Sequence, residues 1–219
     1  MSNFIEKHIK RTNRNLLFTN LGIIIGIFLL WINSAFSEAG YWVLVILGLF
    51  LLACWNIVKL WKRKKNLLLH PINIALSRFG PPEKIANIIN VEAKAPKVEV
   101  KPVIISSSWL FKPSFYGLEM ILLAELAWVY NKVTTNYTNG IRTGESYSVI
   151  INKRDGKSIK VSCGKLASSL LITRVAESAP WVVGGFNEEI KKFWETDFNG
   201  FIAYVDKRKR EINAGSKAN

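Results

Sequence analysis

Two long apolar runs lie close together near the start of the chain. The first covers residues 16–32, interrupted by Thr19 and Asn20, and the second covers residues 41–61. Each run approaches the roughly 20 residues that an α-helix needs to cross a bilayer at about 1.5 Å per residue. The pattern therefore predicts a transmembrane hairpin over residues 15–65, with one span in each run.

Positive charge gathers at the outer ends of these runs. Four basic residues precede the first run: Lys7, Lys10, Arg11 and Arg14. Five lie at the end of the second: Lys59, Lys62, Arg63, Lys64 and Lys65. The connecting segment Asn33–Gly40 carries only Glu38. Because Lys and Arg are enriched on the cytoplasmic flanks of membrane helices, we expect a multi-pass membrane protein with its basic N-terminal segment, residues 1–14, and its C-terminal domain in the cytoplasm.

Tryptophan residues stand at the predicted ends of the spans. They are Trp31, Trp42 and Trp61. An indole is favourable among lipid headgroups because it is apolar with one polar N–H. We therefore interpret these three residues as membrane-interface anchors.

Two features of the hairpin leave alternatives open. Residues 1–37 could instead be a cleaved signal peptide, since Ala35 and Ser37 are small residues near a suitable cleavage site, although the apolar run exceeds the usual length of a signal core. Gly22 and Gly26 form a G-x-x-x-G pair, which serves either packing within the hairpin or a contact in a homo-oligomer.

After the second span the pattern changes to that of a soluble domain. Residues 66–97 predict a helical connector, with helices over Pro71–Arg78 and Pro82–Ala93. Short runs rich in β-branched and aromatic residues then predict six strands. These are Val98–Ile105, Ser108–Lys112, Glu119–Leu123, Ala127–Thr134, Tyr147–Lys153 and Ser158–Cys163.

The chain becomes helical again after these strands. Helices are predicted over Lys165–Ala176 and Glu188–Glu211, and the second has an apolar residue every three or four positions, which indicates one buried face. A small antiparallel sheet covered by C-terminal helices is an α+β fold, here over residues 98–211. We expect residues 212–219 to form a flexible tail.

Two Gly-containing pairs predict chain reversals between strands. Asp155-Gly156 lies between two apolar runs and predicts a two-residue type I′ hairpin turn, in which both central residues have positive φ. Asn139-Gly140 lies in a longer polar stretch and predicts another reversal between antiparallel strands.

Three passages carry a family resemblance: SSWLFKPSFYGLEMILLAELAWVYNKVT, YSVIINKRDGKSIKVSC and WVVGGFNEEIKKFW. Their order of a Trp-bearing strand, a strand ending in W-x-Y, a hairpin and a closing helix resembles the PH-like domains of small bacterial membrane proteins. It is similar in particular to an uncharacterised family with a transmembrane hairpin before such a domain. The resemblance covers about residues 71–210 and implies a PH-like sheet and a place in the bacterial inner membrane. It brings no functional residues, and the long helical C-terminus departs from a minimal PH-like domain.

Motifs for catalysis or cofactor binding are missing from the sequence. Cys54 and Cys163 cannot build a disulfide framework, and His8 and His70 supply too few ligands for a metal site. The sequence contains neither a P-loop nor a G-x-G-x-x-G motif. We therefore expect no cofactor, no metal and no enzymatic activity.

The formal net charge of +14 changes the picture more than any motif. Candidate contacts with an anionic surface are Lys62, Arg63, Lys64 and Lys65 beside the second span, and Lys153, Arg154, Lys157 and Lys160 around the Asp155-Gly156 turn. Nucleic acid is a less favoured partner, because no strand pattern combines basic with aromatic residues.

The sequence as a whole favours a non-enzymatic, membrane-anchored binding or scaffold module. Its expected partners are the lipid bilayer and either another protein or anionic phospholipid. The alternative is a pore-forming or transport-associated hairpin regulated by the soluble domain. Polar groups inside the predicted spans are few, with Asn20 and Asn56 near the cytoplasmic boundary, which favours an anchor over a pore.

Overall fold

The structure, a computed structural model, describes residues 3–34, 41–94 and 98–215 of the 219-residue chain. The chain forms two compact units. The first consists of Met1–Val91 together with Pro113–Glu119, and the second of Glu92–Lys112 together with Met120–Asn219. The predicted connecting loop with Glu38, and the residues Ala35 and Ser37 of the alternative signal peptide, lie outside the described residues.

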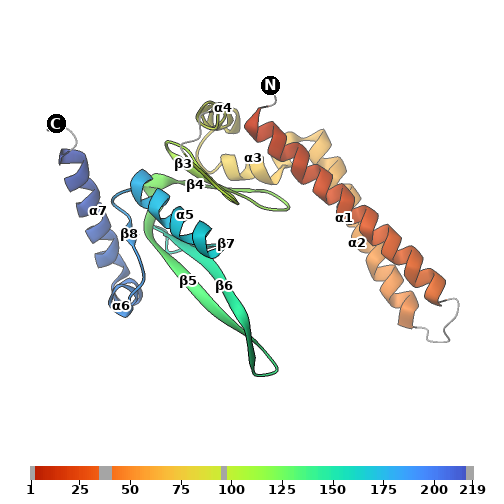
Figure 1. The fold of residues 1–219 in the computed structure, drawn as a ribbon. Helices are drawn as coiled ribbons and strands as arrows, with labels where there is room; N and C mark the ends of the chain where they lie inside the picture. Colours follow the sequence, from red (N-terminus) through yellow and green to blue (C-terminus); the bar gives the residue numbers. More distant parts are fainter. Residues whose placement is uncertain (1–2, 35–40, 95–97, 216–219) are drawn as a thin grey trace. The chain divides into compact units, whose positions relative to one another are not determined.

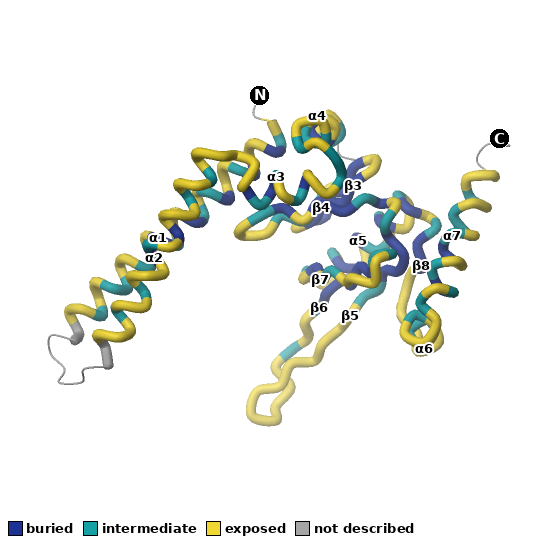
Figure 2. The backbone as a smooth tube through the Cα atoms, turned by 180° about the vertical axis from the view of Figure 1, so that it is seen from behind, coloured by how far each residue is buried: buried dark blue, intermediate teal, exposed yellow. Residues whose placement is uncertain are grey.

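Two long helices form most of the first unit. Helices α1 (Phe4–Ser34) and α2 (Tyr41–Lys65) run side by side in opposite directions (Figure 1). Buried positions recur every three or four residues along α1, as expected for one helix face: Ile5, His8, Thr12, Leu16 and Asn20. The remaining surface of both helices is largely exposed and apolar (Figure 2).

Both helices are long and apolar enough to cross a membrane. The qualifying segments are Phe4–Ile32 and Val43–Lys65, and 11% of the residues in the apolar window of each are buried within the protein. A core helix of a soluble protein would be mostly buried, so this low burial indicates that the apolar surface faces outward. Helix α1 also begins at Phe4, so most of the predicted basic segment is helical.

The predicted helical connector follows α2 as three short helices. They are the 3₁₀-helix η1 (Leu67–Leu69), α3 (Pro71–Leu76) and α4 (Pro82–Glu92). The side chain of Asn66 accepts a hydrogen bond from the backbone N–H of Leu68 at 3.0 Å, and His70 Nδ1 accepts one from Ile72 at 3.2 Å. These caps satisfy N–H groups that a helix start leaves without partners.

The first sheet consists of four short strands in the order β1-β2-β3-β4. They are β1 (Val98–Val100), β2 (Val103–Ile105), β3 (Trp109–Pro113) and β4 (Leu118–Leu122). The prediction of one strand over Val98–Ile105 is wrong, because the chain reverses at Lys101–Pro102 and the two halves pair antiparallel. A 3₁₀-helix η2 (Leu123–Glu125) leads into the second sheet.

The second sheet has the order β7-β6-β5-β8. Strands β5 (Leu126–Thr138) and β6 (Ile141–Lys153) form a long antiparallel hairpin, and β7 (Ser158–Cys163) pairs antiparallel with β6. The short strand β8 (Val183–Gly184), which the sequence did not predict, pairs parallel with β5.

The two predicted reversals exist, but the turn at Asp155-Gly156 is not of the predicted type. Asn139 and Gly140 both have positive φ, 52° and 80°, as a type I′ turn requires, and they directly join β5 to β6. At the other reversal only Gly156 has positive φ, 79°, and its N–H donates to the carbonyl of Lys153. The type I′ prediction for Asp155-Gly156 is therefore wrong, because Asp155 keeps a negative φ.

Helices cover both faces of the second sheet. Helix α5 (Lys165–Ser178) packs through Leu171 and Val175 on one face in a continuous apolar core that also includes residues of the first sheet. On the other face, Phe201 and Val205 of α7 (Phe198–Gly215) pack with Trp128. The α+β class with antiparallel sheets and C-terminal helices is confirmed.

The predicted helix over Glu188–Glu211 is in fact two helices. Helix α6 (Glu188–Thr196) ends before Asp197, which has non-helical backbone angles. The Asp197 carboxylate accepts a hydrogen bond from the N–H of Gly200 at 2.9 Å and so starts α7. Helix α7 then continues to Gly215, past the predicted end.

Candidate functional site

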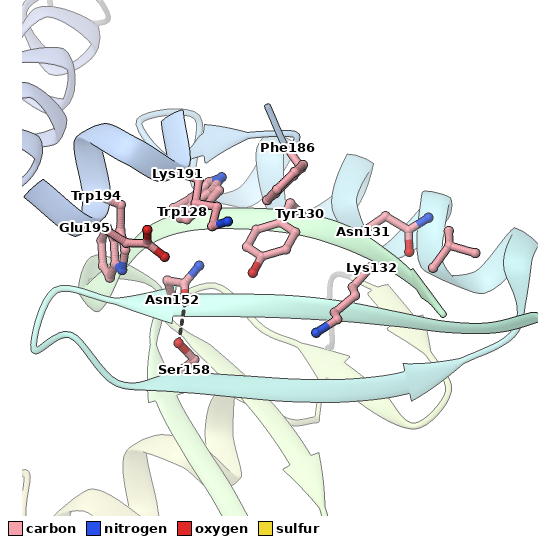
Figure 3. A pocket seen from close by; sticks show the side chains of 11 residues that line it. Trp128, Tyr130, Asn131, Lys132, Asn152, Ser158, Phe186, Lys191, Trp194 and Glu195 are labelled. Atoms are coloured by element: carbon pink, nitrogen blue, oxygen red, sulfur yellow. Dashed lines mark hydrogen bonds between the residues drawn. The ribbon is translucent and has the colours of Figure 1, made fainter. Parts of the chain in front are cut away.

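The second unit contains a pocket of about 460 Å³ with aromatic walls (Figure 3). Residues of β5, β6, β7, the loop after β8 and α6 line it: Trp128, Tyr130, Asn131, Lys132, Val133, Asn152, Ser158, Phe186, Lys191, Trp194 and Glu195. We call it the aromatic pocket. Its volume falls in the range of small-ligand and side-chain binding sites.

The period of two along a strand sets the floor of the aromatic pocket. Trp128, Tyr130 and Lys132 alternate with Val129 and Asn131 along the strand and so share one face of β5. The strand register places Asn152 opposite Trp128, and Ser158 opposite Asn152. Trp128, Asn152 and Ser158 therefore form a row of aromatic and polar side chains across the sheet. The apolar core that packs against α5 lies on the opposite face of the sheet.

The loop after β8 fixes one wall. The indole Nε1 of Trp128 donates to the carbonyl of Gly185 at 2.7 Å, and Gly185 has a φ of 87°, a conformation that favours glycine. The next residue, Phe186, lies 5.2 Å from the Tyr130 ring and 6.2 Å from the Trp128 ring, between ring centroids. These separations are typical of favourable aromatic pairs.

Helix α6 supplies the opposite wall. Lys191, Trp194 and Glu195 are three and four residues apart and so share one helix face. Asn187 caps the start of this helix, with its side-chain oxygen accepting from the N–H of Ile190 at 2.6 Å. Trp194 packs edge-on against Phe201 at 5.0 Å and lies 5.9 Å from Trp128, so buried aromatic contacts hold it in place.

Asn152 and Tyr130 supply hydrogen-bond donors in the aromatic pocket. The Asn152 side-chain oxygen accepts from the Ser158 hydroxyl at 2.5 Å, but its amide nitrogen is buried without a partner among the described residues. Figure 3 shows that nitrogen on the side of Trp128 and Tyr130. Burial raises the pKa of the Tyr130 hydroxyl, with smaller opposing effects from Lys191, which lowers it, and Glu195, which raises it. Tyr130 therefore stays protonated at neutral pH and remains a donor.

The aromatic pocket opens onto an unpaired edge of β5. Strand β8 pairs only with Trp128 and Val129, so beyond Val129 no described strand lies on that side of β5. The N–H of Gly185 donates to the carbonyl of Val129 at 2.9 Å, and the alternation of a strand then points the backbone groups of Asn131 to the same open side. The buried side-chain oxygen of Asn131 also has no partner among the described residues.

The four predicted basic residues around the β6–β7 turn do not line the aromatic pocket, and three of them have carboxylate partners. Lys153 and Lys157 lie 2.9 and 3.6 Å from Asp155, and Arg154 lies 2.6 Å from Asp206 of α7. Lys160 lies on β7, opposite Ile150. A second hollow of about 390 Å³ lies beside this turn. Acidic and basic residues line it together with one alanine: Ala124, Glu125, Lys153, Arg154 and Asp155.

The predicted membrane-facing residues all belong to the first unit. Lys62, Arg63, Lys64 and Lys65 form the last turn of α2. The Lys65 ammonium lies 4.0 Å from the centre of the Trp61 ring, a cation–π contact. Trp31 stacks on Phe28 with 6.3 Å between ring centroids, and both Trp31 and Trp61 are exposed. The side chain of Trp42 lies outside the described residues.

The fold and pocket define an α+β domain that follows two apolar helices. Residues 89–194, which include most of the aromatic pocket, match a family described as "Domain of unknown function (DUF6709)". The comparison with curated proteins gave no match, and neither did the comparison with solved structures. Within the described residues, no group of three or more His, Cys, Asp or Glu side chains is placed to hold a metal ion.

Sequence reasoning missed the aromatic pocket although it noticed parts of it. Trp128 and Tyr130 form the W-x-Y element, and Trp194 belongs to the apolar stripe that was assigned to packing. Phe186 was not singled out, and its signal was the preceding Gly184-Gly185 pair, which indicates a tight backbone bend. Nothing local in the sequence indicated that these four side chains meet.

Proposed function

We propose that this chain is a membrane-anchored, non-enzymatic module that binds an extended segment of a partner protein. In this proposal α1 and α2 span the bacterial inner membrane, and the N-terminus and the second unit lie in the cytoplasm. The exposed apolar surface of both helices supports the anchor, and the basic residues at the outer ends of the hairpin support the orientation.

The PH-like assignment of the soluble domain belongs to the same proposal. Its support is the order of elements: a strand with Trp109, the W-x-Y strand β5, the β6–β7 hairpin and then helix α6, whose Trp194 packs against Trp128 of the sheet. The long C-terminal helix α7 departs from a minimal PH-like domain, and α6 and the loop after β8 supply two walls of the aromatic pocket.

The observation that carries the binding proposal is the junction of the aromatic pocket with the open edge of β5. A strand edge binds an extended peptide through main-chain hydrogen bonds, and an adjacent pocket selects a side chain. Here the pocket offers aromatic walls for an apolar or aromatic side chain. The buried Asn152 nitrogen, on the same face of the sheet as Trp128, adds a hydrogen-bond donor without a partner among the described residues.

Charge pairing favours a protein partner over an anionic lipid surface for the second unit. Three of the four cations around the β6–β7 turn already lie within 4 Å of a carboxylate. Such pairs reduce the attraction of this surface for phosphate groups, because the carboxylates of Asp155 and Asp206 offset two of the four positive charges.

Selection from a random peptide library displayed on phage tests this proposal on the full chain in lipid nanodiscs. We expect recovered peptides to share one aromatic or large apolar residue within an extended stretch. Their affinity is then measured by fluorescence anisotropy against the wild type and three variants. Each variant is first checked for an unchanged thermal unfolding midpoint.

Asn131→Pro removes the outward N–H of the β5 edge, and we expect a roughly tenfold loss of peptide affinity for one lost main-chain hydrogen bond. Asn131→Ala is the matched control, because it changes the same side chain and keeps the N–H. Tyr204→Ala removes an exposed aromatic side chain elsewhere in the unit and should leave affinity unchanged. Failure to enrich any peptide, or equal affinity for the Pro and Ala variants, would contradict the proposal.

A further inference from the structure

The tip of the β3–β4 hairpin belongs to the first unit, which contains α1 and α2. The rest of its sheet belongs to the second unit. Residues Pro113–Glu119 belong to the first unit, so the chain passes between the units three times, after Val91, Lys112 and Glu119. Two hydrogen bonds join this tip to α1. Asn15 Nδ2 donates to the carbonyl of Phe115 at 2.8 Å, and the hydroxyls of Thr19 and Tyr116 are 3.1 Å apart.

The side chains at this tip are aromatic and exposed. Phe115 is 55% exposed and Tyr116 is 48% exposed. Their rings pack edge-on, with 4.7 Å between centroids and an interplanar angle of 85°. A hydrogen bond from the N–H of Ser114 to the carbonyl of Gly117, at 3.0 Å, closes the turn and fixes the pair in place. Two neighbouring exposed aromatic residues at a fixed hairpin tip are unfavourable in water unless another apolar medium covers them.

The contact with Thr19 sets the depth of this tip along α1. Leu16 begins the apolar run, and Thr19 lies three residues further on, which corresponds to about 4–5 Å along a helix. The Tyr116 hydroxyl bonds at this level. If α1 crosses a bilayer as proposed above, that level is the boundary between headgroups and acyl chains, where Tyr is enriched because its ring is apolar and its hydroxyl polar.

We propose that the β3–β4 hairpin is an interfacial finger, whose Phe115 and Tyr116 insert into the leaflet on the side of the soluble domain. The occupant of this surface is lipid, because the finger is continuous with the apolar surface of α1 and hydrogen-bonded to it. The finger would attach the soluble domain to the bilayer at a second place, in addition to the chain that follows α2. This inference rests on the proposed membrane anchor and is independent of the peptide-binding proposal.

Depth-dependent quenching of a fluorophore tests the finger. The full chain with Cys54→Ala and Cys163→Ser receives one new cysteine, at Phe115, at Ile25 or at Tyr137, and is labelled with bimane. Each protein is placed in phosphatidylcholine–phosphatidylglycerol nanodiscs that contain lipid with a spin label either shallow or deep along the acyl chain. Ile25 is an exposed residue near the middle of the apolar run 16–32, and Tyr137 is an exposed residue near the tip of the β5–β6 hairpin.

We expect the label at Phe115 to lose most of its fluorescence with the shallow quencher and little with the deep one. The label at Ile25 should respond more strongly to the deep quencher, and the label at Tyr137 to neither. A Phe115 label that behaves like Tyr137 while Ile25 is quenched would overturn the finger and leave the anchor intact. A blue-shifted but unquenched Phe115 label would indicate coverage by protein, and would also overturn it. An unquenched Ile25 label would overturn the anchor itself.

Discussion

Acidification should destabilise the helical connector through one buried histidine. His70 is fully buried, its Nδ1 accepts the capping hydrogen bond from Ile72, and its Nε2 has no partner among the described residues. Burial, aided by the positive charge of Arg63, lowers the pKa of His70 from 6.5 to about 4. Protonation of Nδ1 would also abolish the cap, because a protonated ring nitrogen cannot accept.

The direction and size of the effect follow from that pKa difference. Because the folded-state pKa lies below the unfolded value, the folded state binds fewer protons, so stability is complete above about pH 6.5 and falls as the pH drops toward 4. A difference of about 2.5 in pKa corresponds to about 3 kcal/mol at most, and about 2 kcal/mol of it would be lost by pH 5. For a chain of this length, 2 kcal/mol lowers the unfolding midpoint by about 4–8 °C.

The assay compares wild type with His70→Asn in nanodiscs at pH 7.5 and pH 5, following unfolding by tryptophan fluorescence. Asparagine keeps a side-chain oxygen for the helix cap and does not titrate in this range. The wild-type midpoint should fall by about 4–8 °C more than that of the variant. His8 is present in both proteins, so its contribution cancels in the difference. An equal fall in the two proteins would refute the assignment to His70.

Two further predictions concern the second unit. Phe201→Ala should lower the free energy of unfolding by about 3–5 kcal/mol, because Phe201 is 1% exposed and packs against Trp194. The control Tyr204→Ala, on the exposed side of α7, should change the free energy of unfolding by less than about 0.5 kcal/mol. Urea unfolding measures both, and similar midpoints would contradict the packing role of Phe201. Gly140→Ala should destabilise the β5–β6 hairpin by about 1 kcal/mol, since φ at this position is 80°, while Gly164→Ala should not. Faster amide hydrogen exchange near the turn in the first variant alone would confirm the prediction.

Elements whose signals are local could be predicted from the sequence. The apolar runs predicted both long helices, and run length is enough because a helix satisfies its own backbone groups wherever it lies. Strand β7 has the bounds that were predicted, Ser158–Cys163, because β-branched residues alternate there between clear turn signals. The Asn187 cap was also predictable, since a side-chain cap depends on residues three positions apart.

The predictions were wrong where the same local sequence signal is compatible with two different backbone structures. Asn139-Gly140 and Asp155-Gly156 both predict reversals, but the first directly joins the two long paired strands β5 and β6, and both its residues have positive φ, as a type I′ turn requires. At the second, Arg154 is drawn to Asp206, which lies 52 residues further along the chain, and the turn takes another form. The predicted helix over residues 188–211 breaks at Asp197 because its side chain caps a new helix start.

The candidate site depends on contacts between distant segments, which no local pattern predicted. Trp128, Tyr130, Phe186 and Trp194 come from three separate segments, and only the pairing of β8 with β5 and the packing of α7 on the sheet bring them together. The same holds for the open edge of β5, which exists because β8 ends after two residues, and for the contact between Thr19 and Tyr116 across 97 residues. The physical reason is that helix and strand signals depend on neighbours within a few residues. Pockets, ion pairs and free strand edges depend on which distant segments share a buried surface, and no local pattern records that choice.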